Sequence, residues 1–226
     1  MDKVAVFDID GTIFRSSLTI EITEAFIEEG IFPAKASSIF KEEHNLWLER
    51  RGTYDDYIAK VVDAYIQHIK GVKLEDAIEV ADMVMLFQKN RVYRYTRSLV
   101  EKYKNSHFLL AISHSPYHIV EPFCREWGFH KVYATMFDVD DAGYFTGEVA
   151  HWDLMQDKSK VLTRAIAKEH LTLRGSVGVG DSKPDAKMLR MVEHPIAFNP
   201  DSGLYKIAKR NKWPIVVERK DVIYKL

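Results

Sequence analysis

The stretch VAVFDIDGT occupies residues 4–12 and decides the fold class of this chain. Its first four residues, Val4–Phe7, are all apolar, which is typical of a strand buried on both faces of a parallel sheet. Asp8 and Asp10 follow at once, with a glycine and a threonine that favour the turn at which a strand ends. Because side chains two apart on a strand point to the same face, we expect both carboxylates at one edge of a sheet.

Short apolar runs separated by amphipathic segments continue beyond residue 95. They predict further strands at Phe108–Ile112, Val132–Ala134, Ser176–Val179, Ile196–Phe198 and Ile215–Val217. Helical patterns lie between them at Thr96–Ser106, Val120–Trp127 and Ser159–Glu169. A turn sequence, DDAG, between two strand-like arms in Met136–Val149 predicts a hairpin. Strands separated by helices predict an α/β fold with a mainly parallel, Rossmann-like sheet and helices on both faces.

Residues 15–94 have a different texture, because their apolar positions recur at helical spacing. One such stripe comprises Tyr54, Tyr57, Ile58, Val61, Val62, Tyr65, Ile66 and Ile69. The pattern predicts an all-helical cap inserted between strands one and two. The expected division is a core domain of residues 1–14 and 95–226 and a cap domain of residues 15–94.

The composition is that of a folded globular protein: 46% of the 226 residues are hydrophobic and 29% are charged. The 32 basic and 33 acidic residues give a formal net charge of −1, so bulk attraction to nucleic acid or an anionic membrane is not expected. A single cysteine, Cys124, excludes an intrachain disulfide framework. With neither a signal-peptide pattern nor an apolar run that could cross a bilayer, we expect a cytoplasmic protein.

Polar residues end three of the predicted strands: Asp8 with Asp10, then Ser113, then Asp181. The carboxyl ends of parallel strands form the ligand site of an open α/β sheet, so these side chains should converge. A small set of oxygen ligands suits Mg²⁺, which also binds phosphate oxygens. With a lysine from the helix that starts near residue 158, this set suits phosphoryl transfer, in which positioning and charge stabilisation supply most of the catalysis.

Each feature alone also has a structural explanation, as a turn, a helix cap or a solvated charge. In this order, however, they resemble the motifs of the haloacid dehalogenase superfamily of phosphohydrolases. The matching stretches are Val4–Thr12, Leu109–Ser113, the lysine in DKSKVL (residues 157–162) and Gly180–Asp185. The helical insertion and the hairpin further resemble the phosphoserine phosphatase-like subgroup. The spacing typical of the family favours Lys158 over Lys160 as the motif lysine.

The resemblance implies catalysis through an aspartyl-phosphate. It makes Asp8 the nucleophile and Asp10 the general acid and base, and it adds Ser113 and Lys158 to the catalytic set. The implied Mg²⁺ site consists of Asp8, Asp10 through its backbone carbonyl, Asp181, and Asp185 in support. The residues expected to bind phosphate or substrate are Gly11, Thr12, Ser17, Ser113, His114 and Lys158.

Two positions depart from the phosphoserine phosphatases. Ser17 stands where those enzymes have an acid for the substrate ammonium, and Val61 aligns with their arginine for the substrate carboxylate. A site without partners for two charged groups rejects a ligand that carries them. We therefore expect a Mg²⁺-dependent phosphatase of a small-molecule phosphomonoester that is not specific for phosphoserine. We expect a monomer or homodimer with no nucleic-acid or membrane partner.

Other functions stay open at this point. A phosphotransferase that passes the phosphoryl group to an acceptor alcohol would use the same residues. A phospho-accepting signalling module also combines acids, Mg²⁺ and a lysine, but it places its aspartate on a later strand and lacks a cap. A dehalogenase would need neither the metal nor Asp10, and a silent binding protein would have no use for the intact motif set.

Overall fold

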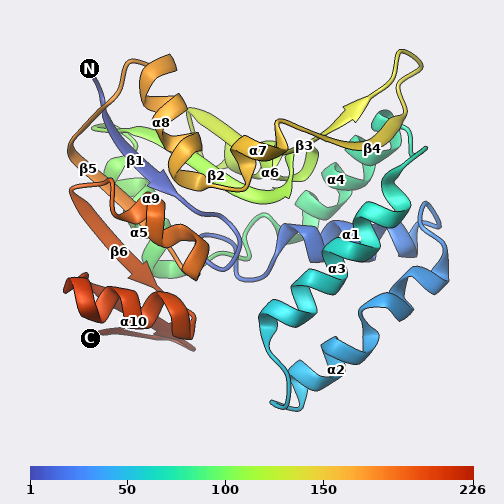
Figure 1. Ribbon diagram of the computed structural model, residues 1–226, viewed down its shortest axis with the longest axis horizontal. Coiled ribbons are helices and arrows are strands. Elements are labelled where there is room, and N and C mark those ends of the chain that lie inside the picture. Colours follow the sequence, from blue (N-terminus) through green and yellow to red (C-terminus); the bar gives the residue numbers. More distant parts are fainter.

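The computed structural model describes residues 1–226 and contains one eight-stranded sheet, in the order β4-β3-β2-β1-β5-β6-β7-β8 (Figure 1). Its strands are β1 (Lys3–Phe7), β2 (Phe108–Pro116), β3 (Lys131–Val139), β4 (Phe145–Ala150), β5 (Thr172–Gly180), β6 (His194–Phe198), β7 (Ile215–Arg219) and β8 (Val222–Lys225). Neighbouring pairs from β3 to β7 are parallel, and only the outer strands β4 and β8 are antiparallel to their neighbours. The mainly parallel sheet is thus confirmed.

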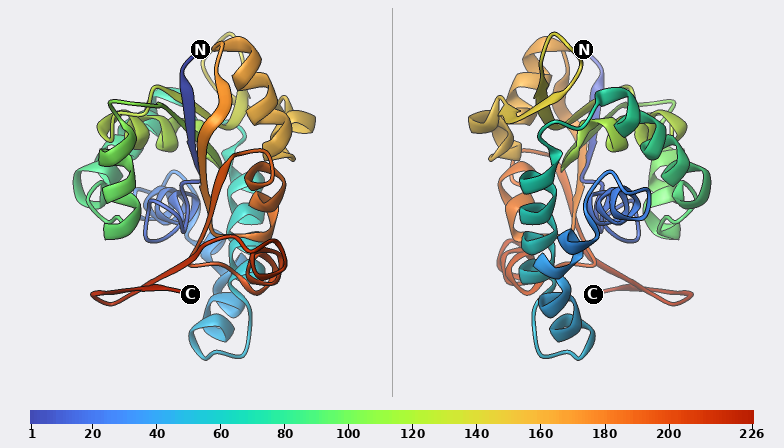
Figure 2. Two further views of the ribbon diagram at one scale, coloured as in Figure 1. Left: turned by 90° about the vertical axis from the view of Figure 1, so that its left-hand side faces the viewer. Right: turned by 90° about the vertical axis from the view of Figure 1, so that its right-hand side faces the viewer.

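Alternate residues of β1 pack on opposite faces of the sheet, as the period of a strand requires. Ala5 and Phe7 belong to one hydrophobic cluster, whereas Val4 and Val6 belong to a second. The first cluster includes side chains of α5 (Arg94–Tyr103) and α6 (Tyr117–Glu126), and the second those of α8 (Lys158–Lys168), α9 (Ala186–Leu189) and α10 (Ser202–Asn211). Figure 2 shows these two groups of helices on opposite sides of the sheet, which confirms the predicted layers.

The segment between β1 and β2 contains helices and no strand of the sheet. Its helices are α1 (Leu18–Glu28), the 3₁₀ helix η1 (Ala34–Ile39), α2 (Lys41–Leu48), α3 (Tyr54–Ile69) and α4 (Leu74–Gln88). The two chain crossings into this segment pair with each other, since Arg15 N–H donates to the Arg91 carbonyl and Tyr93 N–H to the Ile13 carbonyl. These paired crossings lie close to the predicted domain limits of residues 15 and 94. None of the helices combines the length and apolar character needed to cross a membrane.

The hairpin formed by β3 and β4 fastens the far end of this helical segment to the sheet. Gly71 N–H donates to the Phe145 carbonyl over 2.8 Å, and Phe145 N–H donates to the Val72 carbonyl over 2.9 Å. Leu74 N–H donates to the Gly143 carbonyl over 2.9 Å. The loop between α3 and α4 is therefore held by the hairpin, whereas α2 lies at the opposite end of the cap (Figure 1).

Two local predictions need correction. The short strand at Val132–Ala134 and the first hairpin arm are one continuous strand, β3, because its outer half leaves β2 and pairs with β4. The predicted strands end at Ile215–Val217, but the C-terminal segment forms one more strand, β8, which pairs antiparallel with β7. Three of its four residues are exposed, which fits a strand at the edge of the sheet.

His118, on α6, makes the fold acid-sensitive. Its ring lies among Phe26, Tyr65 and Phe145, and its Nε2 is hydrogen-bonded to the Tyr65 hydroxyl over 3.2 Å. Burial lowers the pKa of His118 from 6.5 to about 4. Between pH 4 and pH 6.5, the unfolded chain therefore binds a proton at His118 more readily than the folded protein does. This difference should lower the free energy of unfolding by about 2 kcal/mol between pH 7 and pH 5.

The His118→Gln variant keeps an acceptor for Tyr65 but cannot titrate, so its stability should fall less over the same pH range. Denaturant unfolding of both proteins at pH 7 and pH 5 measures the difference. Parallel losses in the two proteins would show that other groups cause the acid sensitivity.

Candidate active site

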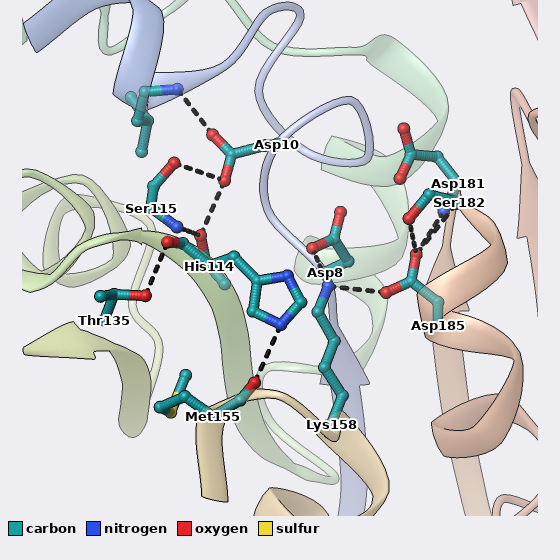
Figure 3. Close-up of polar contacts among 12 residues, drawn as sticks. Asp8, Asp10, His114, Ser115, Thr135, Met155, Lys158, Asp181, Ser182 and Asp185 are labelled. Carbon is teal, nitrogen blue, oxygen red and sulfur yellow. Dashed lines mark hydrogen bonds and ion pairs between the residues drawn. The ribbon is translucent and has the colours of Figure 1, made fainter. Parts of the chain in front are cut away.

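The carboxyl end of β1 places Asp8 against a buried lysine. Lys158 is the first residue of α8, and only 3% of its side chain is exposed. Its ammonium lies 2.5 Å from Oδ1 of Asp8 and 2.6 Å from Oδ1 of Asp185 (Figure 3). Lys160 is exposed on the same helix. Of the two lysines considered from the sequence, the structure therefore brings Lys158 to the carboxylates.

Asp185 is fully buried, and both of its carboxylate oxygens are engaged. Oδ1 accepts from Lys158, and Oδ2 accepts from the backbone N–H of Asp181 and from the N–H and hydroxyl of Ser182, each over 3.0 Å. Burial would raise the pKa of Asp185, but Lys158 and the Ser182 hydrogen bonds outweigh it and lower the pKa. This arrangement favours a supporting role for Asp185, which orients Lys158 and the loop that carries Asp181.

Asp181 is the carboxylate that suits a cation. Its side chain makes no hydrogen bond or ion pair with the protein, and oxygens of Asp8, Asp181 and Asp185 lie within 4.8 Å of one another. Burial, and then the charges of Asp8 and Asp185, raise the pKa of Asp181 well above its ordinary value. One lysine cannot balance three carboxylates, so a small oxygen-binding cation such as Mg²⁺ fits this donor set.

Gly11 is fixed by its closeness to the same carboxylate. A Cβ atom at this position would collide with the Asp181 side chain, and the backbone has φ +76°, in the left-handed region. The glycine therefore allows the loop after β1 to approach the end of β5. The predicted substrate-binding role of Gly11 remains a prediction, and what the structure shows is this close approach.

Asp10 points away from Asp8, toward the start of the cap. Its Oδ1 accepts from the Leu18 N–H over 2.6 Å, and its Oδ2 accepts from the hydroxyls of Ser113 and Ser115, over 2.7 and 2.9 Å (Figure 3). The carboxylate is thus held between the end of β2 and the first turn of α1. Because both carboxylate oxygens are engaged, Asp10 would contact a metal through its backbone carbonyl, as the resemblance implies.

Ser115 is a site residue that the sequence interpretation missed. It is 2% exposed and shares Asp10 with Ser113, and its hydroxyl lies 2.7 Å from that of Thr19 on α1. A usable signal was present, because side chains two apart at the end of a strand face the same way. The sequence Ser113-His114-Ser115 therefore offered two hydroxyls to one carboxylate.

Two of the predicted substrate residues have structural partners, and a third is buried without one. Ser17 caps α1 by accepting from the Thr19 N–H, and Nε2–H of His114 donates to the Met155 carbonyl over 2.9 Å. Thr12 is buried, and its hydroxyl has no hydrogen-bond partner in the protein. Substrate contacts by these three residues stay predictions.

Tyr54, at the start of α3, is a cap side chain whose pKa is affected by Asp10 and Asp181. Burial, and then the charges of Asp10 and Asp181, raise its pKa. Its ring packs edge-on against Trp47, with the centroids 5.5 Å apart. Val61, by contrast, is fully buried in the cap cluster, so the position aligned with an arginine in phosphoserine phosphatases serves packing in this chain.

Comparisons with known proteins give one family and relatives that match along most of this chain. The model of the haloacid dehalogenase-like hydrolase family matches residues 5–190. The "Inhibition of morphological differentiation protein" of Streptomyces azureus is 26% identical over 94% of this chain and 77% of its own length. Histidinol-phosphatase from Neisseria meningitidis serogroup C is 25% identical over 96% of this chain and 99% of its own length.

A solved structure titled as a phospho-aspartyl intermediate analogue of phosphoserine phosphatase has the same fold. It aligns with a TM-score of 0.61 and 22% sequence identity, and the match covers 97% of this chain and 95% of that chain. The alignment therefore extends over nearly the whole chain.

Proposed function

Because the chain belongs to the haloacid dehalogenase-like hydrolase family, we propose that it is a Mg²⁺-dependent phosphatase that hydrolyses a small-molecule phosphomonoester through an aspartyl-phosphate. The observation that carries the proposal is the pairing of Asp8 with buried Lys158 beside an unpaired Asp181. A nucleophile, a phosphate-binding cation and a site for a metal then meet at one sheet edge. The match to a phospho-aspartyl analogue structure supports the covalent step.

In the first half of the proposed reaction, a carboxylate oxygen of Asp8 attacks phosphorus and the bond to the ester oxygen breaks. Asp10 gives its proton to the leaving alkoxide. Water then attacks the aspartyl-phosphate, Asp10 takes the water proton, and the bond between phosphorus and Asp8 breaks. A bound Mg²⁺ would neutralise phosphoryl oxygen charge, held by Asp8, Asp181 and the Asp10 carbonyl.

The hydrogen bonds around Asp10 suit a group that gains and loses a proton. In the Ser115–Thr19 hydroxyl pair either oxygen can be the donor, so Ser115 can donate to an ionised Asp10 or accept from a protonated one. The Leu18 N–H keeps the carboxyl in place in both states. We infer that Ser115 is a positioning residue for the acid and base step.

The cap supports a substrate other than phosphoserine. Ser17 is occupied as a helix cap and Val61 is buried, so neither position offers a charge to an amino-acid ligand. The relatives include a histidinol-phosphatase and a phosphoserine phosphatase structure, whose substrates differ outside the phosphate. We therefore propose that the phosphoryl site is shared with these proteins and that the rest of the substrate site is particular to this chain.

Phosphate release from a panel of phosphomonoesters should require Mg²⁺. Chelation with EDTA should lower turnover by about 100-fold or more, because the metal stabilises charge on the transferring group, and added Mg²⁺ should restore it. Adding acceptor alcohols and following labelled phosphate separates hydrolysis from transfer. Turnover that persists in EDTA would contradict the metal requirement, and the absence of turnover on every ester would contradict the phosphatase.

A further inference from the structure

A cavity of about 340 Å³ lies beside the catalytic acid, between the cap and the β3–β4 hairpin. Its walls come from α3, from β3 and β4, from the short helix α7 (Trp152–Met155) and from the end of β2. The size is within the range of small-molecule sites, which are typically concave and mostly apolar. Neither the proposed mechanism nor the sequence motifs use this cavity.

Asp10 does not itself line the cavity, but it is connected to a residue that does. Thr19 and His114 line it, and the Thr19 hydroxyl is linked through Ser115 to Asp10 by contacts of 2.7 and 2.9 Å. Figure 3 shows Ser115, His114 and Met155 grouped apart from Asp181 and Asp185. A general acid must lie next to the leaving oxygen, so the leaving alcohol belongs on this side of the phosphoryl group.

The lining of the cavity is uncharged. Its twelve residues include no Asp, Glu, Lys or Arg, and seven of them are hydrophobic. The Thr135 hydroxyl donates to the His114 carbonyl, and the Tyr65 hydroxyl is bonded to His118, so these polar atoms are already satisfied. An ammonium or carboxylate in this cavity would lose water without gaining a partner of opposite charge, whereas an apolar group would be favoured.

The rim of the cavity carries exposed apolar side chains from both layers. Val62 and Ile66 on α3 face Trp152 of α7, and these side chains are 37%, 42% and 51% exposed. The loop that follows α3 is hydrogen-bonded to the β3–β4 hairpin. These bonds hold the α3 wall of the cavity next to the hairpin wall. The apolar surface thus forms one fixed site, open to solvent at its rim.

We propose that this cavity seats the alcohol part of the substrate and selects phosphomonoesters of an uncharged, apolar alcohol. The inference rests on the proposed phosphatase function, because it assigns the leaving-group side of that same site. It also agrees with the lack of amino-acid-binding charges in the cap.

The test measures binding of n-alkylphosphonates, which cannot be hydrolysed, to the Mg²⁺-loaded protein by calorimetry. Each methylene added between methyl- and butylphosphonate should lower Kd about three- to fourfold. Propylphosphonate should bind about tenfold or more tightly than 2-aminoethylphosphonate, which has the same size but carries an ammonium. A flat series, no binding, or tighter binding of the amine would overturn the proposal.

A pair of variants places this binding in the cavity. Val62→Glu puts a carboxylate at its rim and should remove the chain-length dependence, with methylphosphonate affinity changed less than about twofold. Val222→Glu makes the same change at a similarly exposed valine on β8 (45%) and should leave the series intact. Equal effects of the two variants would overturn the assignment. A dependence on chain length without ester turnover would instead overturn the phosphatase function.

Discussion

Replacing Asp8 with asparagine is expected to lower kcat for phosphomonoester hydrolysis by about 10⁴-fold or more while the protein stays folded. The amide cannot form the bond to phosphorus, and no other carboxylate can take its place. Asp10 is turned toward the cap by three hydrogen bonds, and Asp185 is engaged at both oxygens. Steady-state kinetics, with mass spectrometry of trapped phosphopeptide, measure the loss of turnover and of the adduct on residue 8.

The stability of this variant separates chemistry from folding. Burial raises the pKa of Asp8 to about 7, which means that the folded protein disfavours the charged form of this side chain. In metal-free buffer at pH 8, Asp8 is nevertheless ionised, and its charge lowers the stability of the fold. The Asp8→Asn variant should therefore unfold at no lower denaturant concentration than the parent. The control is Asp2→Asn, at an exposed position just before the same strand, which should change neither property. Activity that survives in Asp8→Asn would exclude Asp8 as the nucleophile.

The fold could be predicted from the sequence because its signals are local. The short, wholly apolar run at Val4–Phe7 ends in turn residues and favours a buried strand, whereas the helical spacing of the stripe on α3 favours a helix. The limits of β3 and the existence of β8 could not be predicted in this way. A strand that changes neighbours halfway, and a short strand at the end of the chain, depend on the partner and not on the segment itself.

The site was predictable where a motif coincides with a strand end, as at Asp8, Ser113 and Asp181. The direction of each side chain was not, because it depends on contacts between distant segments. Asp10 is oriented by Leu18 and Ser115, which lie 8 and 105 residues away. The cavity beside it joins the cap, the hairpin and α7, so no local pattern in the sequence could reveal its uncharged lining.

Replacing Lys158 with methionine is expected to destabilise the protein by about 3–5 kcal/mol and to lower kcat/KM by about 10²–10³-fold. The ammonium is the only protein cation paired with Asp8 and Asp185, which are 4% and 0% exposed. Without it, the buried carboxylates repel each other, and the phosphoryl group loses a charged donor. Denaturant unfolding and steady-state kinetics measure the two effects.

Three further measurements show that the loss arises from this pairing. Lys160→Met removes an exposed charge from the same helix and should change stability by less than about 0.5 kcal/mol, with activity kept. In the double variant Lys158→Met/Asp185→Asn, one repelling carboxylate is gone, so much of the stability should return while activity stays low. Mg²⁺ should stabilise Lys158→Met more than the parent, because the cation then balances charge that the lysine no longer does. If Lys160→Met is the inactive variant instead, the motif lysine is Lys160, and Lys158 does not hold the phosphoryl group.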